Sequence, residues 1–114
     1  RTQAIKQQRL LEYGQTTLEA FQEVENGLIQ EIKQKQRVDN IGRQLELAQK
    51  SNRQLRVEFL NGFSPYLDVL IGLDAEQQLR RDYIVSQRQL ILIRIALYRA
   101  LAGGFETERE IDNQ

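Results

Sequence analysis

The chain of 114 residues contains no cysteine and no histidine. Without these side chains it has no thiol nucleophile, no disulfide framework, no zinc-type ligand set and no imidazole for acid–base chemistry. Acidic pairs such as Glu23 and Glu25 are two residues apart and do not share a helix face. The adjacent Gly103 and Gly104 do not follow a strand pattern, so they do not form a phosphate loop. We therefore expect no enzyme, no catalytic residue, no metal site and no cofactor.

An excess of charge of one sign is also lacking, because 16 Lys and Arg residues balance 16 Asp and Glu residues. This balance argues against binding to nucleic acid or to anionic lipid. No apolar run approaches the roughly 20 residues that cross a bilayer as a helix. The longest, residues 90–101, is interrupted by Arg94 and Arg99. The chain begins at Arg1 in mid-pattern with no signal peptide, and we interpret it as a piece of a longer protein.

Proline and strong turn sequences are scarce. The one proline, Pro65, lies in the only clear turn sequence, Asn61-Gly62-Phe63-Ser64-Pro65. Gly62 supplies a positive φ there, Ser64 can serve as a helix N-cap, and Pro65 fits the first helical position. Gly103 fits a helix C-cap. These positions predict a helix over about residues 2–61, a tip turn over about 61–65, a helix over about 65–102 and a polar tail over 103–114.

Between these breaks, apolar or small residues recur in steps of three and four, or their sums, which is typical of coiled coils. The first series contains Leu18, Phe21, Val24, Leu28, Ile32, Val38, Ile41, Leu45, Ala48, Leu55 and Phe59. The second contains Leu67, Leu70, Leu73, Ile84, Leu90, Ile91, Leu97 and Leu101. We predict an all-α fold, a long antiparallel two-helix coiled-coil hairpin whose turn pairs Ile41 with Val85 and Leu28 with Tyr98. Because two helices bury only one seam, we expect the chain to self-associate into a helical bundle.

Three segments carry a resemblance to a known family. They are TLEAFQEVENGL at residues 17–28, NGFSPYLDVL at 61–70 and LIRIALYRALAGGF at 92–105. In this order and spacing they resemble the C-terminal repeat of TolC-like outer membrane efflux proteins, which carries an AFQEVE-type helix, a G-x-x-x-[YF]-L-D-V-L turn and an ALYRALGGGW-type ending.

The resemblance implies a periplasmic tunnel segment of a trimeric channel in the Gram-negative cell envelope. The trimer would form the exit duct of a tripartite export system, with a periplasmic adaptor protein and an inner-membrane pump as partners. Contact with the outer membrane would come from β-barrel segments that are missing from this sequence.

The same resemblance implies functional residues at the turn. Gly62, Phe63, Ser64 and Tyr66 would form the tip that docks the adaptor, and Asp68 would line the pore constriction as one of three carboxylates. Each residue also has a purely structural interpretation. Gly62 can serve the chain reversal alone, Tyr66 can pack onto its own hairpin, and Asp68 can complement the helix dipole.

The sequence departs from the family in two places. Some relatives carry a second acidic residue where Ile71 stands, and some tips are locked by an arginine where Ser64 stands. Two other hypotheses stay open: a coiled-coil hairpin of a periplasmic adaptor (membrane fusion) protein, and a helical scaffold or dimerisation module. An adaptor hairpin would be flanked by lipoyl-type β segments, and a scaffold would belong to a protein without a signal peptide.

Overall fold

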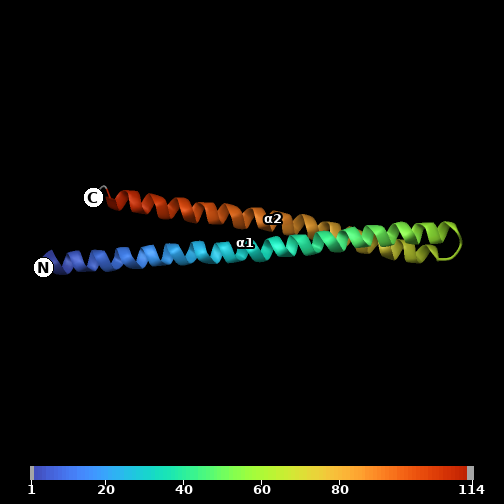
Figure 1. The fold of residues 1–114 in the computed structure, drawn as a ribbon, viewed down its shortest axis with the longest axis horizontal. Helices are drawn as coiled ribbons and strands as arrows, with labels where there is room; N and C mark the ends of the chain where they lie inside the picture. The colour runs from blue at the N-terminus through green and yellow to red at the C-terminus, as the bar shows by residue number, and fades with distance from the viewer. Residues whose placement is uncertain (1, 113–114) are drawn as a thin grey trace. The chain divides into compact units, whose positions relative to one another are not determined.

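Two helices make up the computed structural model of the chain. Helix α1 spans Thr2–Leu60 and helix α2 spans Tyr66–Asp112, with a short turn between them (Figure 1). The structure describes the backbone of residues 2–112 and the side chains of residues 2–103. No strand occurs in this range, and the two helices run antiparallel on either side of the turn. The predicted all-α two-helix hairpin is confirmed.

The hairpin divides into two units. Residues Lys33–Ile91, which include the turn, form what we name the turn unit. Residues Arg1–Ile32 and Leu92–Gln114 form the terminal unit. Each unit contains one stretch of α1 and one stretch of α2, and each has its own seam between them.

In the turn unit the two helices meet along a regular repeat. The α1 residues that are buried or half-buried there include Val38, Ile41, Leu45, Ala48, Asn52 and Leu55. Those on α2 include Val69, Leu73, Glu76, Leu79, Tyr83, Ser86 and Leu90. Steps of three and four are the spacing of an antiparallel coiled coil. The predicted seam is confirmed on α1 from Val38 to Leu55, whereas on α2 it was only partly right, because Leu67, Leu70, Ile84 and Ile91 are exposed.

In the terminal unit the predicted seam on α1 was largely wrong. Leu18, Phe21, Leu28 and Ile32 are exposed, and of the predicted residues only Val24 faces the partner helix. The residues that are buried or half-buried there include Tyr13, Ala20, Val24, Gly27 and Glu31 on α1, and Ile93, Arg94, Leu97 and Ala100 on α2. On α2, Leu97 is buried as predicted and Leu101 is exposed.

Small residues decide which face closes in the terminal unit. A Cβ added to Gly27 would lie 2.9 Å from Cδ1 of Leu97, so the leucine occupies the space that a side chain would fill. Helices approach closely where one of them lacks bulk. Because α1 carries two stripes with the same spacing, the periodicity alone does not select the inner one. The contacts of Gly27 with Leu97 and of Gly42 with Tyr83 lie within one or two residues of the predicted pairing.

Helix α2 does not end where the sequence suggested. It continues through Gly103 and Gly104 to Asp112, so the predicted C-cap at Gly103 and the predicted polar tail over residues 103–112 were wrong. Among the glycines of the described backbone, only Gly62 has a positive φ, which a left-handed cap requires. A glycine inside a helix costs about 1 kcal/mol, which helix-forming neighbours can offset. Residues 113–114 of the predicted tail lie outside the described residues.

Candidate docking site at the helical turn

The turn begins with a hydrogen-bonded cap on α1. The Phe63 N–H donates to the Glu58 carbonyl at 2.8 Å, and the Gly62 N–H donates to the Phe59 carbonyl at 3.0 Å. This pair of bonds is the Schellman motif, in which the residue after the cap takes a left-handed conformation. Gly62 has φ 77°, and a side chain at this φ would be strained. The predicted positive φ of Gly62 is confirmed.

Ser64 closes the turn from the other side. Its hydroxyl donates to Oε2 of Glu58 at 2.9 Å, back towards α1. Helix α2 begins at Tyr66, one residue later than predicted, and the Asp68 N–H donates to the Pro65 carbonyl at 3.1 Å. The predicted N-cap role of Ser64 is therefore replaced by a link between the turn and the last turn of α1.

The turn presents exposed apolar side chains. Phe63 is 82% exposed and Leu60 is 80% exposed. Tyr66 is also exposed on one side, although its ring lies against that of Phe59 with centroids 5.2 Å apart and planes tilted by 50°. Leu67 continues the apolar surface onto the first turn of α2. Clustered apolar groups that a short turn leaves in water are typical of a docking surface.

Asp68 lies just beyond this surface. It is exposed and is the acidic residue in the first turn of α2. A carboxylate there complements the positive end of the helix dipole, which fulfils the structural interpretation within one chain. The acidic ring at a pore constriction needs further copies of the chain and stays a prediction.

A buried polar layer, which was not predicted from the sequence, crosses the turn unit. Asn52 is 8% exposed, and its Nδ2 donates to the Gly72 carbonyl at 2.8 Å and to Oε1 of Glu76 at 3.2 Å. The other oxygen of Glu76, itself buried, pairs with Arg80 at 3.3 Å. A Cβ on Gly72 would collide with Oδ1 of Asn52, so glycine is required at this contact. Two polar residues at seam positions, Asn52 and Glu76, were the available sequence clue.

An open groove of about 920 Å³ lies in the terminal unit, and the sequence analysis missed this feature too. Its lining includes Ala20, Phe21 and Val24 from α1, with Ala96 and Ala100 from α2. The hydroxyls of Thr16 and Thr17, which also line the groove, donate to the backbone carbonyls four residues earlier, at 2.8 and 2.9 Å. The groove is therefore a mostly apolar surface suited to another helix or to an apolar group.

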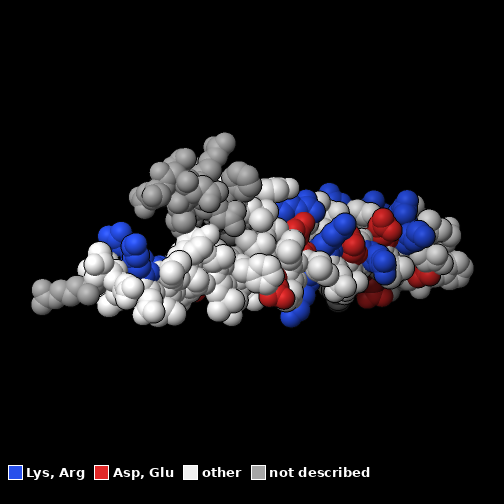
Figure 2. All heavy atoms as spheres, turned by 60° about the vertical axis from the view of Figure 1, so that its left-hand side comes forward, with Lys and Arg blue, Asp and Glu red and all other residues white. Residues whose placement is uncertain are grey.

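One face of the molecule is seen in the space-filling view of Figure 2. In Figure 2 the turn unit carries basic and acidic side chains side by side, whereas the visible face of the terminal unit is mostly uncharged. The buried apolar side chains of residues 2–103 are only Val38, Leu90 and Leu97, and most larger apolar residues are exposed. No group of three potential metal ligands occurs among the described residues. No helix in that part of the chain combines the length and apolar character needed to span a membrane.

Comparison with known proteins identifies no relative: no protein-family model, no curated protein and no solved structure matches the chain.

Proposed function

We propose that the chain is a periplasmic tunnel hairpin of a trimeric outer membrane efflux channel. It forms part of the wall of the exit duct of a tripartite export system, and a periplasmic adaptor protein docks at its turn. The three sequence blocks at residues 17–28, 61–70 and 92–105 support this family of function. The observation that carries the proposal is structural: the seam between the two helices buries few apolar residues, and large apolar residues of both helices, among them Phe21, Leu47 and Ile84, lie exposed.

A helix in the wall of a duct has a neighbour on each side, and the exposed apolar residues of the terminal unit provide a surface for a second neighbour. Here α1 has one stripe that faces α2, through Ala20, Gly27 and Glu31. A second stripe, with the same coiled-coil spacing, is exposed through Leu18, Phe21 and Leu28. A helix with two such stripes packs between two neighbours, as in bundles and barrels. A lone hairpin supplies only one of those neighbours, so other chains or segments must supply the second.

The turn supplies the docking surface. Phe63 is held in solvent because the Schellman motif fixes the backbone on either side of Gly62. Tyr66 is oriented by its contact with Phe59, so the aromatic surface is ordered before any partner arrives. An ordered anchor loses little conformational entropy on binding. The surface suits an adaptor that contacts the duct at its tip.

Opening and closing of the duct then follow from packing alone. Neighbouring hairpins hold the tip shut, and one hairpin moves outward when the adaptor engages its turn, a change between two packing arrangements. Three copies of Asp68 around the axis would favour cations at the constriction. No chemical step is required of any residue.

The test is a substitution at the turn in the protein as the cell makes it. Phe63→Ala should lower efflux, measured as increased drug susceptibility, while the amount of protein in the envelope is unchanged. Lys50→Ala is the control, because Lys50 is exposed on α1, is not part of the outward apolar surface and lies away from the turn. Equal susceptibility of both variants and the unaltered protein would contradict the proposed docking role.

A hairpin of a periplasmic adaptor is the second candidate. The exposed aromatic turn favours it, since a two-helix hairpin with such a tip could equally be the partner that approaches a duct. The two functions predict different surroundings in the parent protein. Lipoyl-type β segments on both sides of the hairpin would select the adaptor, and alternating membrane-type strands would select the duct.

A further inference from the structure

Two rows of exposed charges run along the outside of the turn unit, one on each helix. Within each row the residues are seven apart, so they lie on one face of a coiled-coil helix. The rows consist of Asp39, Glu46 and Arg53 on α1 and Asp74, Arg81 and Arg88 on α2. The ion pairs of residues 2–103 are Arg80–Glu76 and Arg94–Glu31, so none of the six charges has an opposite charge as its partner.

The heights of these residues, meaning their positions along the long axis of the turn unit, follow from the contacts between the two helices. Gly42 lies against Tyr83, and Asn52 lies against Gly72 and Glu76. Because the helices are antiparallel, counting back along α1 corresponds to counting forward along α2. Asp39 therefore stands within about half a helical turn of the height of Arg88. By the same count, Glu46 stands near the height of Arg81 and Arg53 near that of Asp74.

We propose that a second copy of this chain docks on the turn unit with its α2 beside α1 of the first copy, both turns at the same height. The interface then contains three opposite-charge pairs, Asp39 with Arg88, Glu46 with Arg81, and Arg53 with Asp74. Gly42 and Gln49 lie between the charges on α1, and Gln77 and Ile84 lie between them on α2, in the same steps of three and four. Leu60 meets Leu67 beyond the charges, and both are exposed in one chain.

Other alignments of the same two helices are worse. A shift by seven residues in one direction sets Glu46 against Asp74 and Arg53 against Leu67. The opposite shift sets Arg53 against Arg81 and Leu60 against Asp74. Each shift replaces pairs by a like-charge contact and by a charge against a leucine, and both contacts are unfavourable. The charge pattern therefore specifies one register.

Pairing of identical helices is also disfavoured by this pattern. A parallel pair of α1 helices in register sets each charge against its own copy. An antiparallel pair centred on Glu46 matches Asp39 with Arg53 but sets Glu46 against itself, and an antiparallel α2 pair has the same fault at Arg81. The mixed α1–α2 contact is the arrangement that matches all three charges, and charge complementarity of this kind selects partners.

This contact joins different surfaces of the two copies, so each copy keeps one unused α1 face or α2 face for the next. Such contacts close into rings or extend into filaments. The inference deepens the proposed function and rests on it only in that copies of the chain stand side by side. Nothing in the charge pattern depends on the transported substrate or on the adaptor.

Charge-reversed variants of the 114-residue chain provide the test. The first variant reverses the α1 row, with Asp39→Arg, Glu46→Arg and Arg53→Glu. The second reverses the α2 row, with Asp74→Arg, Arg81→Glu and Arg88→Glu. Each variant alone should have a dissociation constant for self-association raised by about tenfold or more, since three pairs become like-charge contacts. An equimolar mixture of the two variants should return to the dissociation constant of the unaltered chain, because both of its mixed contacts are complementary.

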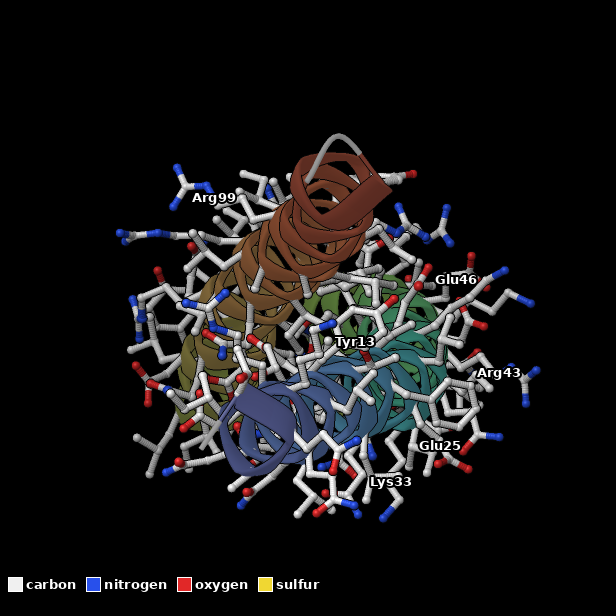
Figure 3. All side chains as sticks on the ribbon, turned by 90° about the vertical axis from the view of Figure 1, so that its left-hand side faces the viewer. Tyr13, Glu25, Lys33, Arg43, Glu46 and Arg99 are labelled. Atoms are coloured by element: carbon white, nitrogen blue, oxygen red, sulfur yellow. The ribbon has the colours of Figure 1, made fainter. Side chains whose placement is uncertain are left out.

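The matched control is Arg37→Glu, which makes the same change of net charge as reversing the α2 row; Arg37 is exposed, and at two residues from Asp39 it does not share the face of the α1 row. In Figure 3, which looks along the helices, Glu46 of the α1 row projects from α1 into solvent. Sedimentation equilibrium gives the dissociation constants, and circular dichroism confirms equal helix content. The control should self-associate like the unaltered chain. An unaltered chain that stays monomeric, single variants that associate normally, or a mixture that fails to recover would each overturn the proposed interface.

A cross-link provides a measurement that does not depend on charge. Because the chain has no cysteine, Gln49→Cys and Gln77→Cys chains can be oxidised after mixing without competing thiols. Mixed disulfides should exceed Gln49→Cys homodimers, and a predominance of homodimers would contradict the interface. If the reversed variants recover on mixing while Phe63→Ala leaves efflux unchanged, the interface stands and the duct function fails. If efflux depends on Phe63 and the mixture does not recover, only the interface is overturned.

Discussion

The turn unit and the terminal unit fill their seams with residues of different size. In the turn unit, larger residues such as Val38 and Leu45 fill the seam, a buried amide at Asn52 joins the helices, and the outer surface carries charges of both signs. In the terminal unit, Ala20 and Gly27 let the helices approach, and large apolar residues lie outside. Outer apolar surface favours association without directing it, whereas outer charges select a register.

Leucines that face the partner helix should contribute more to the free energy of unfolding than leucines that face solvent. Leu97→Ala should lower the free energy of unfolding by about 2–4 kcal/mol, because Leu97 is buried against Gly27. Leu47→Ala, on the exposed face of the turn unit, should change it by about 0.5 kcal/mol or less. Urea denaturation at one low chain concentration measures both. Equal losses would mean that the inner seam of the terminal unit does not hold the hairpin together.

Removing the buried polar layer of Asn52 and Glu76 should have the next largest effect on the free energy of unfolding. Asn52→Ala should destabilise the chain by about 1–3 kcal/mol, because the buried carboxylate of Glu76 loses its partner on α1. Replacing both residues by leucine should recover most of this loss, since the buried carboxylate of Glu76 is then removed together with the amide that binds it. The double variant is the control, again by urea denaturation. No recovery would indicate that Asn52 acts through its contact with Gly72 instead.

Two glycines should respond to alanine with opposite signs. Gly62→Ala should cost about 1–2 kcal/mol, because an alanine at φ 77° is strained. Gly14→Ala should stabilise by up to about 1 kcal/mol, because Gly14 lies inside α1 with nothing within 4 Å of an added Cβ. Thermal unfolding followed by circular dichroism distinguishes the two. A loss of stability at Gly14 would show that a neighbour occupies that position in solution.

Ser64→Ala should have a smaller effect on stability than Gly62→Ala. Ser64→Ala removes the hydrogen bond to Glu58 across the turn and should cost about 0.5–1.5 kcal/mol. Glu58→Gln keeps an acceptor oxygen and should cost less, which makes it the matched control. If Ser64→Ala were instead as costly as Gly62→Ala, the hydroxyl would hold α2 as well as α1.

Local features of the fold could be predicted from the sequence because the causes are local. The Gly62 and Pro65 positions fix the turn, and helix-forming residues without proline fix α1 up to Leu60. The end of α2 could not be predicted, because Gly103 and Gly104 interrupt the pattern without ending the helix. A cap depends on φ, which the residue type permits without requiring.

The sequence does not show which of two equivalent faces of a helix packs against the other helix. Phe21 and Leu28 follow the same spacing as the true seam, and only the contact of Gly27 with Leu97 shows which face closes. The partnership of Asn52 with Glu76 likewise requires the register of the two helices. At the turn, the exposure of Phe63 was predictable because five residues cannot bury a phenyl ring. The role of Asp68 in a constriction depends on neighbouring copies and stays a prediction.

The central claim is that the outward apolar residues are covered by other chains. Sedimentation equilibrium of the 114-residue chain over a range of micromolar concentrations, with circular dichroism on the same samples, tests it most directly. We predict a helical species whose mass rises above the 13.4 kDa of one chain as concentration increases. A fully helical species that keeps the mass of one chain at every concentration would contradict the account.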